Sequence, residues 1–312
     1  MRLPGAASVC FLLLGSAVIA AEPAAAPKIY PLAAKSLVLD VARADDALIA
    51  VGDRGFILRS TDGGTNWVQQ ASPAAAMLTG VRMLDATNGW AVGHDAVILK
   101  TADGGVTWTK AFEDPELEAP LFDIWFENAQ HGIAVGAYGL IEETQDGGAT
   151  WQDRRISEDE PHLYTIAPLP DGGLIAVGEM GGIFKSADKG ATWNPLPSPY
   201  EGTFFGALVQ KDGAILVYGL RGNLYRSEDG GNVWSQIETR TETSLLGATE
   251  RADGGVVIVG LSGTVLSSRD GRTFTVASLP EREALGGAIE AAPGKLLVFG
   301  ERGAYALPEP RR

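Results

Sequence analysis

The sequence has little cysteine, little histidine and a shortage of basic residues. Its 312 residues include one cysteine and three histidines, and 25 Lys and Arg stand against 39 Asp and Glu, for a formal net charge of -14. A single cysteine excludes a disulfide framework and a thiolate zinc cluster. The acidic balance excludes the basic footprint that binds nucleic-acid phosphates, and it disfavours electrostatic docking to anionic lipid. We therefore expect no nucleic-acid partner, no metal and no cofactor.

The one long apolar run lies at the N-terminus. It extends from Ala6 to Ala21 after Arg2, is too short for a comfortable membrane span, and ends in small residues. These features predict a secretory signal peptide over residues 1–21 and a flexible Ala- and Pro-rich leader over residues 22–27. Cleavage removes Cys10 and Arg2, so the formal charge falls by one, from -14 to -15. We expect a periplasmic or secreted protein whose mature part is not inserted in a membrane.

A repeat of about 41 residues organises the chain after residue 28. Each repeat reads as four short β-branched strands bounded by turn residues; in the second they cover 78–84, 89–93, 96–100 and 107–111. A Ser/Thr-x-Asp turn marks six repeats, and an apolar run ending in glycine adds a seventh. The pattern predicts an all-β fold, one seven-bladed β-propeller over residues 28–312. The turn residues are Asp62 and Trp67, Asp103 and Trp108, Asp146 and Trp151, Asp188 and Trp193, Asp229 and Trp234, and Asp270 and Phe274.

The two ends of the repeat region indicate how the ring closes. Repeat seven provides three strands and stops at Pro308, without a fourth. The segment 28–32 precedes the first strand of repeat one and is otherwise unassigned. We predict that this N-terminal segment supplies the outer strand of blade seven, because that exchange would hide sheet edges that otherwise promote aggregation.

The repeated turn between strands three and four is interpreted as structural. Its aspartate can accept N–H groups of its own turn, its glycines allow a positive φ, and its tryptophan supplies a large ring to bury. A hard cation needs six or more oxygen ligands, and one carboxylate per turn falls short of that. We therefore expect fold-stabilising turns in which the aspartates neither bind calcium nor act in catalysis.

The turn motif resembles the Asp-box, or BNR repeat, of sialidases and other propellers, which enzymes and non-enzymes share. An Ala/Val-Val-Gly-x-x-Gly-x-Ile pattern precedes each box, as in Ala50 to Ile57 and Ala176 to Ile183. Together the two patterns resemble the photosystem II stability/assembly-factor family over residues 28–307. The resemblance implies a seven-bladed propeller that acts as a non-catalytic assembly or accessory factor at a membrane. Photosynthetic members carry an arginine-rich patch, but this chain is acidic, so we expect a bacterial exported relative serving another envelope complex.

One face of the predicted propeller is the more varied. It carries the turns between strands two and three and the loops that join one blade to the next, and two of these loops, 113–118 and 153–160, are acidic. These loops predict an acidic rim around a ring of mixed charge that binds a protein partner; ordinary solvated loops are the alternative. The candidate partner-binding residues are Arg54, His94, Tyr138, Glu179, Arg221 and Arg302.

No catalytic constellation stands out in the sequence. A sialidase-like site needs an arginine cluster, a tyrosine nucleophile with a glutamate, and an acid; the arginines here are scattered, and Tyr138 and Glu179 on neighbouring blades are the only hint. His94, His131 and His162 belong to different loops, and no metal or nucleophile motif appears. We predict a monomeric, non-enzymatic scaffold for a protein partner in an envelope or membrane complex. The alternative is an Asp-box glycoside hydrolase or a carbohydrate-binding propeller.

Overall fold

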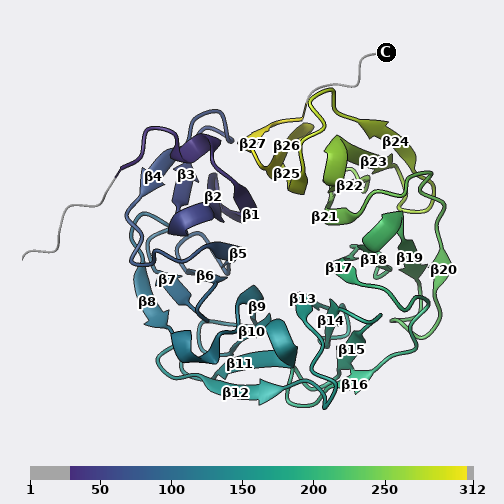
Figure 1. Ribbon diagram of the computed structural model, residues 1–312, viewed down its shortest axis with the longest axis horizontal. Coiled ribbons are helices and arrows are strands. Elements are labelled where there is room, and N and C mark those ends of the chain that lie inside the picture. Colours follow the sequence, from purple (N-terminus) through teal and green to yellow (C-terminus); the bar gives the residue numbers. More distant parts are fainter. Residues whose placement is uncertain (1–28, 308–312) are drawn as a thin grey trace, which may run out of the picture.

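The structure is a computed structural model that describes residues 29–307. These residues form seven antiparallel sheets arranged as blades around a central axis, and the only helices among them are short 3-10 turns (Figure 1). None of the described helices is long and apolar enough to cross a membrane. The prediction of an all-β, seven-bladed propeller is confirmed. The predicted signal peptide, the leader and residues 308–312 of the predicted domain lie outside the described residues.

Six blades are four-stranded and the seventh has three strands among the described residues, each ordered from the axis outwards. Blades one to three are β1 (Val38–Ala44), β2 (Ala47–Gly52), β3 (Ile57–Ser60), β4 (Val68–Gln70); β5 (Leu78–Met83), β6 (Gly89–Gly93), β7 (Ile98–Thr101), β8 (Thr109–Phe112); β9 (Leu121–Phe126), β10 (Gly132–Gly136), β11 (Leu140–Thr144) and β12 (Gln152–Arg155). Blades four to seven are β13 (Leu163–Pro168), β14 (Leu174–Gly178), β15 (Ile183–Ser186), β16 (Asn194–Pro195); β17 (Phe204–Val209), β18 (Ile215–Gly219), β19 (Leu224–Ser227), β20 (Ser235–Gln236); β21 (Leu245–Glu250), β22 (Val256–Gly260), β23 (Thr264–Ser268), β24 (Thr275–Ser278); β25 (Leu285–Ala292), β26 (Lys295–Gly300) and β27 (Gly303–Ala306).

The core consists of apolar layers between neighbouring blades. The second strand of a blade supplies both of its layers, because successive side chains in a strand point to opposite faces. In β2, Ile49 and Val51 pack in the layer shared with blade two, whereas Leu48 and Ala50 pack in the layer shared with blade seven. A strand buried on both faces reads as a continuous apolar run, which is why these strands stand out in the sequence.

Each aspartate turn closes on its own backbone. In the second blade, Asp103 Oδ1 accepts the N–H groups of Val106 and Thr107 at 3.1 and 2.9 Å, and its Oδ2 accepts the Thr107 hydroxyl at 2.6 Å. The same bonds in other blades, led by those from Thr150 and Thr192, hold the pKa of Asp146 and of Asp188 down to about 2. These carboxylates are therefore already occupied by hydrogen bonds within the turn.

Among residues 29–307, no N-terminal strand pairs with blade seven. Residues 29–32 form no strand; Tyr30 instead packs its ring 5.2 Å from that of Phe56 in blade one, and its carbonyl accepts the N–H of Ala33 in a turn. The first contact holds the segment against blade one, and the second folds it into a turn. A segment in a turn cannot serve as the outer strand of blade seven. The prediction that residues 28–32 complete blade seven is therefore wrong for the four of them that the structure describes.

Closure depends instead on the same apolar packing as every other blade interface. Val38 and Val41 of blade one form one buried cluster with Leu297 and Phe299 of blade seven. The 3-10 turn η1 (Ala33–Lys35) packs against β27 beside this seam. Burial between complete blade faces joins the first and last repeats.

Two faces of the ring differ in what they carry. We call "entry face" the face at which each inner strand begins, together with the turns between second and third strands; the aspartate turns lie on the opposite face. The entry face is the one on which the sequence places the candidate partner-binding residues. The inner strands of the blades lie nearest the centre of the ring (Figure 1).

Candidate functional site

The inner strands of the seven blades line a central cavity of about 550 Å³. Each of these strands has a register shift close to its start on the entry face. A bulge of this kind breaks the alternation of side chains and re-aims them. As a result, two successive residues of one strand can both face the cavity, as Phe122 and Asp123 do in β9 and Tyr164 and Thr165 do in β13.

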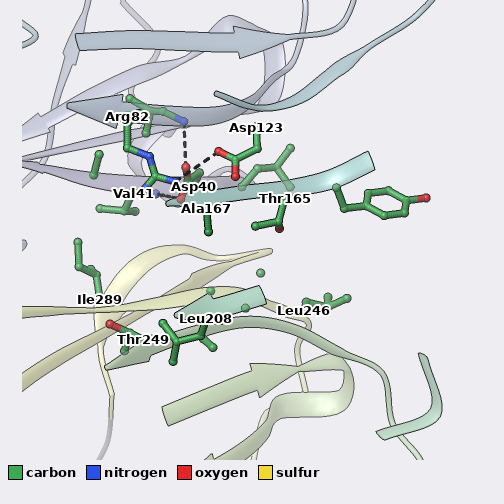
Figure 2. A pocket seen from close by; sticks show the side chains of 18 of the residues that line it. Asp40, Val41, Arg82, Asp123, Thr165, Ala167, Leu208, Leu246, Thr249 and Ile289 are labelled. Carbon is green, nitrogen blue, oxygen red and sulfur yellow. Dashed lines mark hydrogen bonds and ion pairs between the residues drawn. The ribbon is translucent and has the colours of Figure 1, made fainter. Parts of the chain in front are cut away.

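Charged side chains gather on one side of the cavity. Figure 2 shows Asp40, Arg82 and Asp123 together, across the space from Leu208 and Ile289. They come from three consecutive blades, and the Arg82 guanidinium lies 3.5 Å from Asp123 Oδ1. The cavity is therefore asymmetric, with ionisable groups on blades one to three and an apolar wall on blades five and seven.

Each of the two cavity carboxylates ties two blades together. Asp40 accepts the N–H of Val41 in its own strand at 2.8 Å and the N–H of Val81 in blade two at 2.9 Å. Asp123 accepts in the same way from Ile124 at 2.8 Å and from Ile166 in blade four at 3.1 Å. These bonds satisfy inner-strand donors that have no further strand beside them.

Burial in the cavity disfavours the charged form of both carboxyl groups. It raises the pKa of Asp40 to about 6, although the Val81 N–H and the Arg82 charge act in the opposite direction. Burial likewise raises the pKa of Asp123, again against the Arg82 charge. Both groups are acids whose ionisation depends on what else enters the cavity.

Three aromatic rings line the cavity mouth at the entry face. Phe122, Tyr164 and Phe205 occupy the same position in β9, β13 and β17, and we call them the aromatic crescent. The ring centroids of Phe122 and Tyr164 are 5.1 Å apart, and those of Tyr164 and Phe205 are 5.4 Å apart. All three side chains are partly exposed. The crescent is a continuous apolar surface over three adjacent blades.

The crescent extends outwards to two of the candidate residues. The Tyr138 ring packs edge-on against His162, with 4.8 Å between centroids, and His162 Nδ1 lies 3.8 Å from a carboxylate oxygen of Glu179. The Tyr164 hydroxyl donates to the other oxygen of Glu179 at 3.4 Å. Burial, aided by this carboxylate, raises the pKa of Tyr164 to about 12. The structure thus brings Tyr138 and Glu179 together through His162.

The other candidates lie apart. Arg54 is 3.4 Å from Asp53 of its own turn, and Arg302 is 3.1 Å from Glu283. The six candidate residues lie on six different blades, and within residues 29–307 no hydrogen bond or ion pair joins any two of them.

Backbone geometry explains why several of these side chains stand out from the surface. The Phe56 N–H donates to the Asp53 carbonyl at 2.9 Å across Arg54 and Gly55, which both have positive φ. This is the two-residue turn that fits the right-handed twist of a hairpin. Tyr138 and Arg221 hold the same position in their blades, with φ of 55° and 56°. In these blades, the first residue of the turn between the second and third strands therefore projects its side chain from the entry face.

The cavity residues Asp40, Arg82 and Asp123 and the aromatic crescent are not among the residues predicted from the sequence. The repeats did contain a signal, because aligned inner strands vary at the crescent position while their first residue stays apolar. The residues at that position, from blade one to blade seven, are Leu39, Thr79, Phe122, Tyr164, Phe205, Leu246 and Gly286.

A metal site is not apparent in the described part of the chain. Within residues 29–307, no group of three or more His, Cys, Asp or Glu side chains is placed to hold a metal ion. His131 lies between Glu127 and Glu143 on the aspartate-turn face, at 3.2 and 3.1 Å, where the two carboxylates also contact Lys189 and Arg154. That arrangement is a local network of polar contacts that joins blades three and four.

The fold and the site define a seven-bladed β-propeller with an open axial cavity and an aromatic mouth. The sequence profile of the family described as photosynthesis system II assembly factor YCF48 matches residues 22–118 and 112–267. The chain therefore belongs to this family. No curated protein matches the chain in sequence.

Solved structures share the fold at low sequence identity. A structure of YCF48 bound to D1 peptide is 21% identical with a TM-score of 0.73, and the match covers 87% of this chain and 92% of that one. YCF48 from Cyanidioschyzon merolae is 18% identical with a TM-score of 0.70, over 88% and 96%. A streptogramin B lyase is 12% identical with a TM-score of 0.75, over 88% and 95%. At these identities the likeness shows the fold alone.

Proposed function

We propose that this protein is a non-enzymatic assembly or accessory factor that binds a protein partner through its entry face. The observation that carries the proposal is the partly exposed aromatic crescent at the cavity mouth, in a chain whose family is described as an assembly factor. Aromatic side chains are enriched where proteins bind one another. The YCF48 structure with a D1 peptide supports a peptide segment as the form in which the partner is held.

We further propose that the partner belongs to an envelope complex and differs from the photosynthetic one. The predicted signal peptide supports export. Arg54 and Arg302, on the neighbouring blades one and seven, each lie beside a carboxylate, that of Asp53 and of Glu283, and Arg221 lies on blade five, so these three arginines do not form an unpaired basic patch. A partner that binds through an arginine patch is therefore not expected to bind at these three residues.

The non-enzymatic part of the proposal is supported by how the ionisable groups are used. Asp40 and Asp123 each accept two backbone N–H groups, and no arginine is joined to the Tyr138 and Glu179 pair among the described residues. A glycoside hydrolase of the sialidase type would need that pair beside an arginine cluster.

Affinity capture tests the proposal, with the mature chain as bait and an envelope extract as source. Replacing Tyr138 (51% exposed) and Met180 (62%) by serine removes apolar surface from the entry face. Val106 (46%) and Val233 (66%), in aspartate turns, give a matched control pair on the opposite face. We expect a stoichiometric partner that the entry-face variant loses and the control variant retains.

Three results would contradict the proposal. Loss of the partner in the control variant alone would place binding on the aspartate-turn face. Turnover of any member of a panel of aryl glycosides by the mature chain would favour the hydrolase alternative, and retention of saccharide without turnover would favour a carbohydrate-binding propeller.

A further inference from the structure

We propose that the cavity mouth on blades three to five receives a basic peptide segment, whose lysine or arginine side chain lies between the aromatic crescent and the carboxylates of Asp123 and Glu179. The inference deepens the proposed function and rests on it for the identity of the occupant as a protein segment. It names the surface that binds and the chemistry of what is bound.

The size and asymmetry of the cavity fit one side chain with a few flanking residues. A volume of about 550 Å³ is that of a typical small-ligand pocket. Blades three to five present the aromatic crescent at the mouth, whereas blade seven presents Gly286 and Gly287 at the corresponding positions. The glycine side leaves room for a peptide backbone, and the ring side offers the surface on which its side chains pack.

The crescent favours a cation among the possible occupants. Aromatic faces attract ammonium and guanidinium groups, and the attraction is stronger where water is excluded. The rings of Phe122 and Tyr164 are inclined by only 30°, so they form one wall. Asp123 follows Phe122 directly in β9 and also lines the cavity, so a carboxylate lies just below the rings.

Charge around the mouth points the same way. Glu158, Asp159 and Glu160 are exposed in the loop that leads into β13, and this loop contacts the Tyr138 turn through the Gly139 N–H, which donates to the Pro161 carbonyl at 2.9 Å. The one arginine paired to this loop is Arg155, 3.9 Å from Glu160. Surplus negative charge at a binding site steers and selects a positively charged partner.

Deeper in the cavity, Arg82 accompanies Asp123 but leaves Asp40 without a side-chain ion pair at 4.0 Å or less among the described residues. Burial raises the pKa of Asp40, and the Arg82 charge offsets this only in part, so the carboxyl group lacks a close positive charge. An entering lysine or arginine would supply it. An acidic segment would add to the surplus of negative charge around the mouth, so its binding is disfavoured.

The probe for a direct test is a fluorescein-labelled pentapeptide amide with the sequence Gly-Leu-Lys-Leu-Gly. Two matched peptides carry glutamate or serine in place of the lysine. Binding to the full mature chain is followed by fluorescence anisotropy at low salt and again at high salt. We expect the lysine peptide to bind, the glutamate peptide not to bind, and the affinity for lysine to fall as salt screens the charges.

Variants test the surface without disturbing the fold. The double substitution Phe122→Leu and Phe205→Leu keeps apolar volume and removes two aromatic faces, and leucine already occupies this position at Leu39 and Leu246. We expect it to weaken binding about tenfold. Glu179→Gln removes one charge and keeps an acceptor for the Tyr164 hydroxyl; we expect about a threefold loss.

Asp45→Asn is the matched control for charge. Asp45 is exposed, lies in the turn between β1 and β2 on the opposite face, and has a φ of 54°, which asparagine adopts readily. The Asp45→Asn substitution changes the net charge as much as Glu179→Gln does. If peptide binding is unchanged in Asp45→Asn, the loss of affinity in Glu179→Gln arises at the cavity mouth. Thermal melting of each variant checks that it is folded.

The outcomes separate this inference from the proposed function. Equal binding of the lysine and glutamate peptides, or full affinity in a folded double-leucine variant, would overturn the inference. A partner captured from extracts and retained by the double-leucine variant would leave the proposed function standing and the inference wrong. Lysine-selective binding at the mouth without any stoichiometric partner would uphold the site and remove the proposed function.

Discussion

Glu142 is a single residue that departs from the pattern of its repeat. It is only 1% exposed and occupies a position of β11 where other third strands place large apolar side chains. Burial raises its pKa to about 7, with the Asp153 charge acting in the same direction and Arg155 against it. The equivalent residues in the first, second, fourth, fifth and sixth blades are Leu58, Leu99, Phe184, Tyr225 and Leu266.

A pH dependence of stability follows at this residue. Because the pKa of Glu142 is raised on folding from 4.5 to about 7, the folded state holds the proton more tightly than the unfolded state. The contribution of Glu142 to the free energy of unfolding is therefore fully present below pH 4.5 and is lost as the pH rises through 7. We expect Glu142→Gln to raise the free energy of unfolding at pH 8 by about 2 kcal/mol relative to its effect at pH 4.5. Urea unfolding of both proteins at the two pH values measures this difference, and an equal effect at both would contradict it.

The aspartate turns show how far single residues can be interpreted from sequence. Asp, Gly and Thr at fixed offsets predict a turn that satisfies its own N–H groups, and Asp103 does so with Val106 and Thr107. Glu142 could not be interpreted in this way, because a glutamate in an alternating strand reads as exposed. Its burial depends on the neighbouring blade.

At the scale of elements, the predicted strands agree with the observed ones most closely near the axis. In blade two, the predicted strands 78–84 and 89–93 correspond to β5 and β6 almost residue for residue. The outer strands begin two residues later than predicted, at Ile98 and Thr109. The reason is local: the His94 to Val97 turn and the Asp103 carboxylate take up backbone groups that would otherwise pair in the sheet.

The inner strand of blade seven offers a test of how its bulge is packed. A Cβ at Gly287 would lie 2.3 Å from the Phe299 ring of β26, whereas a Cβ at the adjacent Gly286 would meet nothing closer than 3.6 Å. Neither glycine has a positive φ, so the two differ in contact alone. We expect Gly287→Ala to lower the free energy of unfolding by about 2 kcal/mol, because the ring must move, and Gly286→Ala to change it by less than about 0.5 kcal/mol. Chemical denaturation of the two variants measures these free energies of unfolding. Similar losses of stability in both would mean that strand propensity, and not the contact with the Phe299 ring, causes the destabilisation.

At the scale of the whole molecule, the ring is held shut by a contact that recurs between blades. In blades one, two and four, a glycine of the aspartate turn (Gly64, Gly105 and Gly190) lies against a second-strand side chain of the preceding blade. A Cβ at Gly105 would lie 2.4 Å from Ile49 Cδ1, and a Cβ at Gly64 would lie 2.2 Å from Leu297 Cδ1 across the seam between blades one and seven. The seam thus uses the same contact as an ordinary interface.

Equal sensitivity of the seam and of an ordinary interface is the expected consequence. Gly64 and Gly105 have φ of 79° and 80°, so alanine is strained equally at both. We expect Gly64→Ala and Gly105→Ala each to cost about 2 to 3 kcal/mol of unfolding free energy, from strain and crowding together. Calorimetry of both variants measures this, with Gly286→Ala as a control. A much smaller cost for Gly64→Ala would show that something other than blade packing closes the ring.

The number of blades, the all-β class, the turn chemistry and the family resemblance can all be inferred from the amino-acid sequence. These follow from a regular period, from β-branched runs and from hydrogen bonds made within a few residues, all of which are local. The way in which the ring closes and the side chains that line its central cavity depend on how the blades pack in three dimensions. Asp40, Arg82 and Asp123, like the rings of Phe122, Tyr164 and Phe205, lie about 41 residues apart in the chain, and bulges set their direction. Residues so far apart meet only because successive blades turn about one axis.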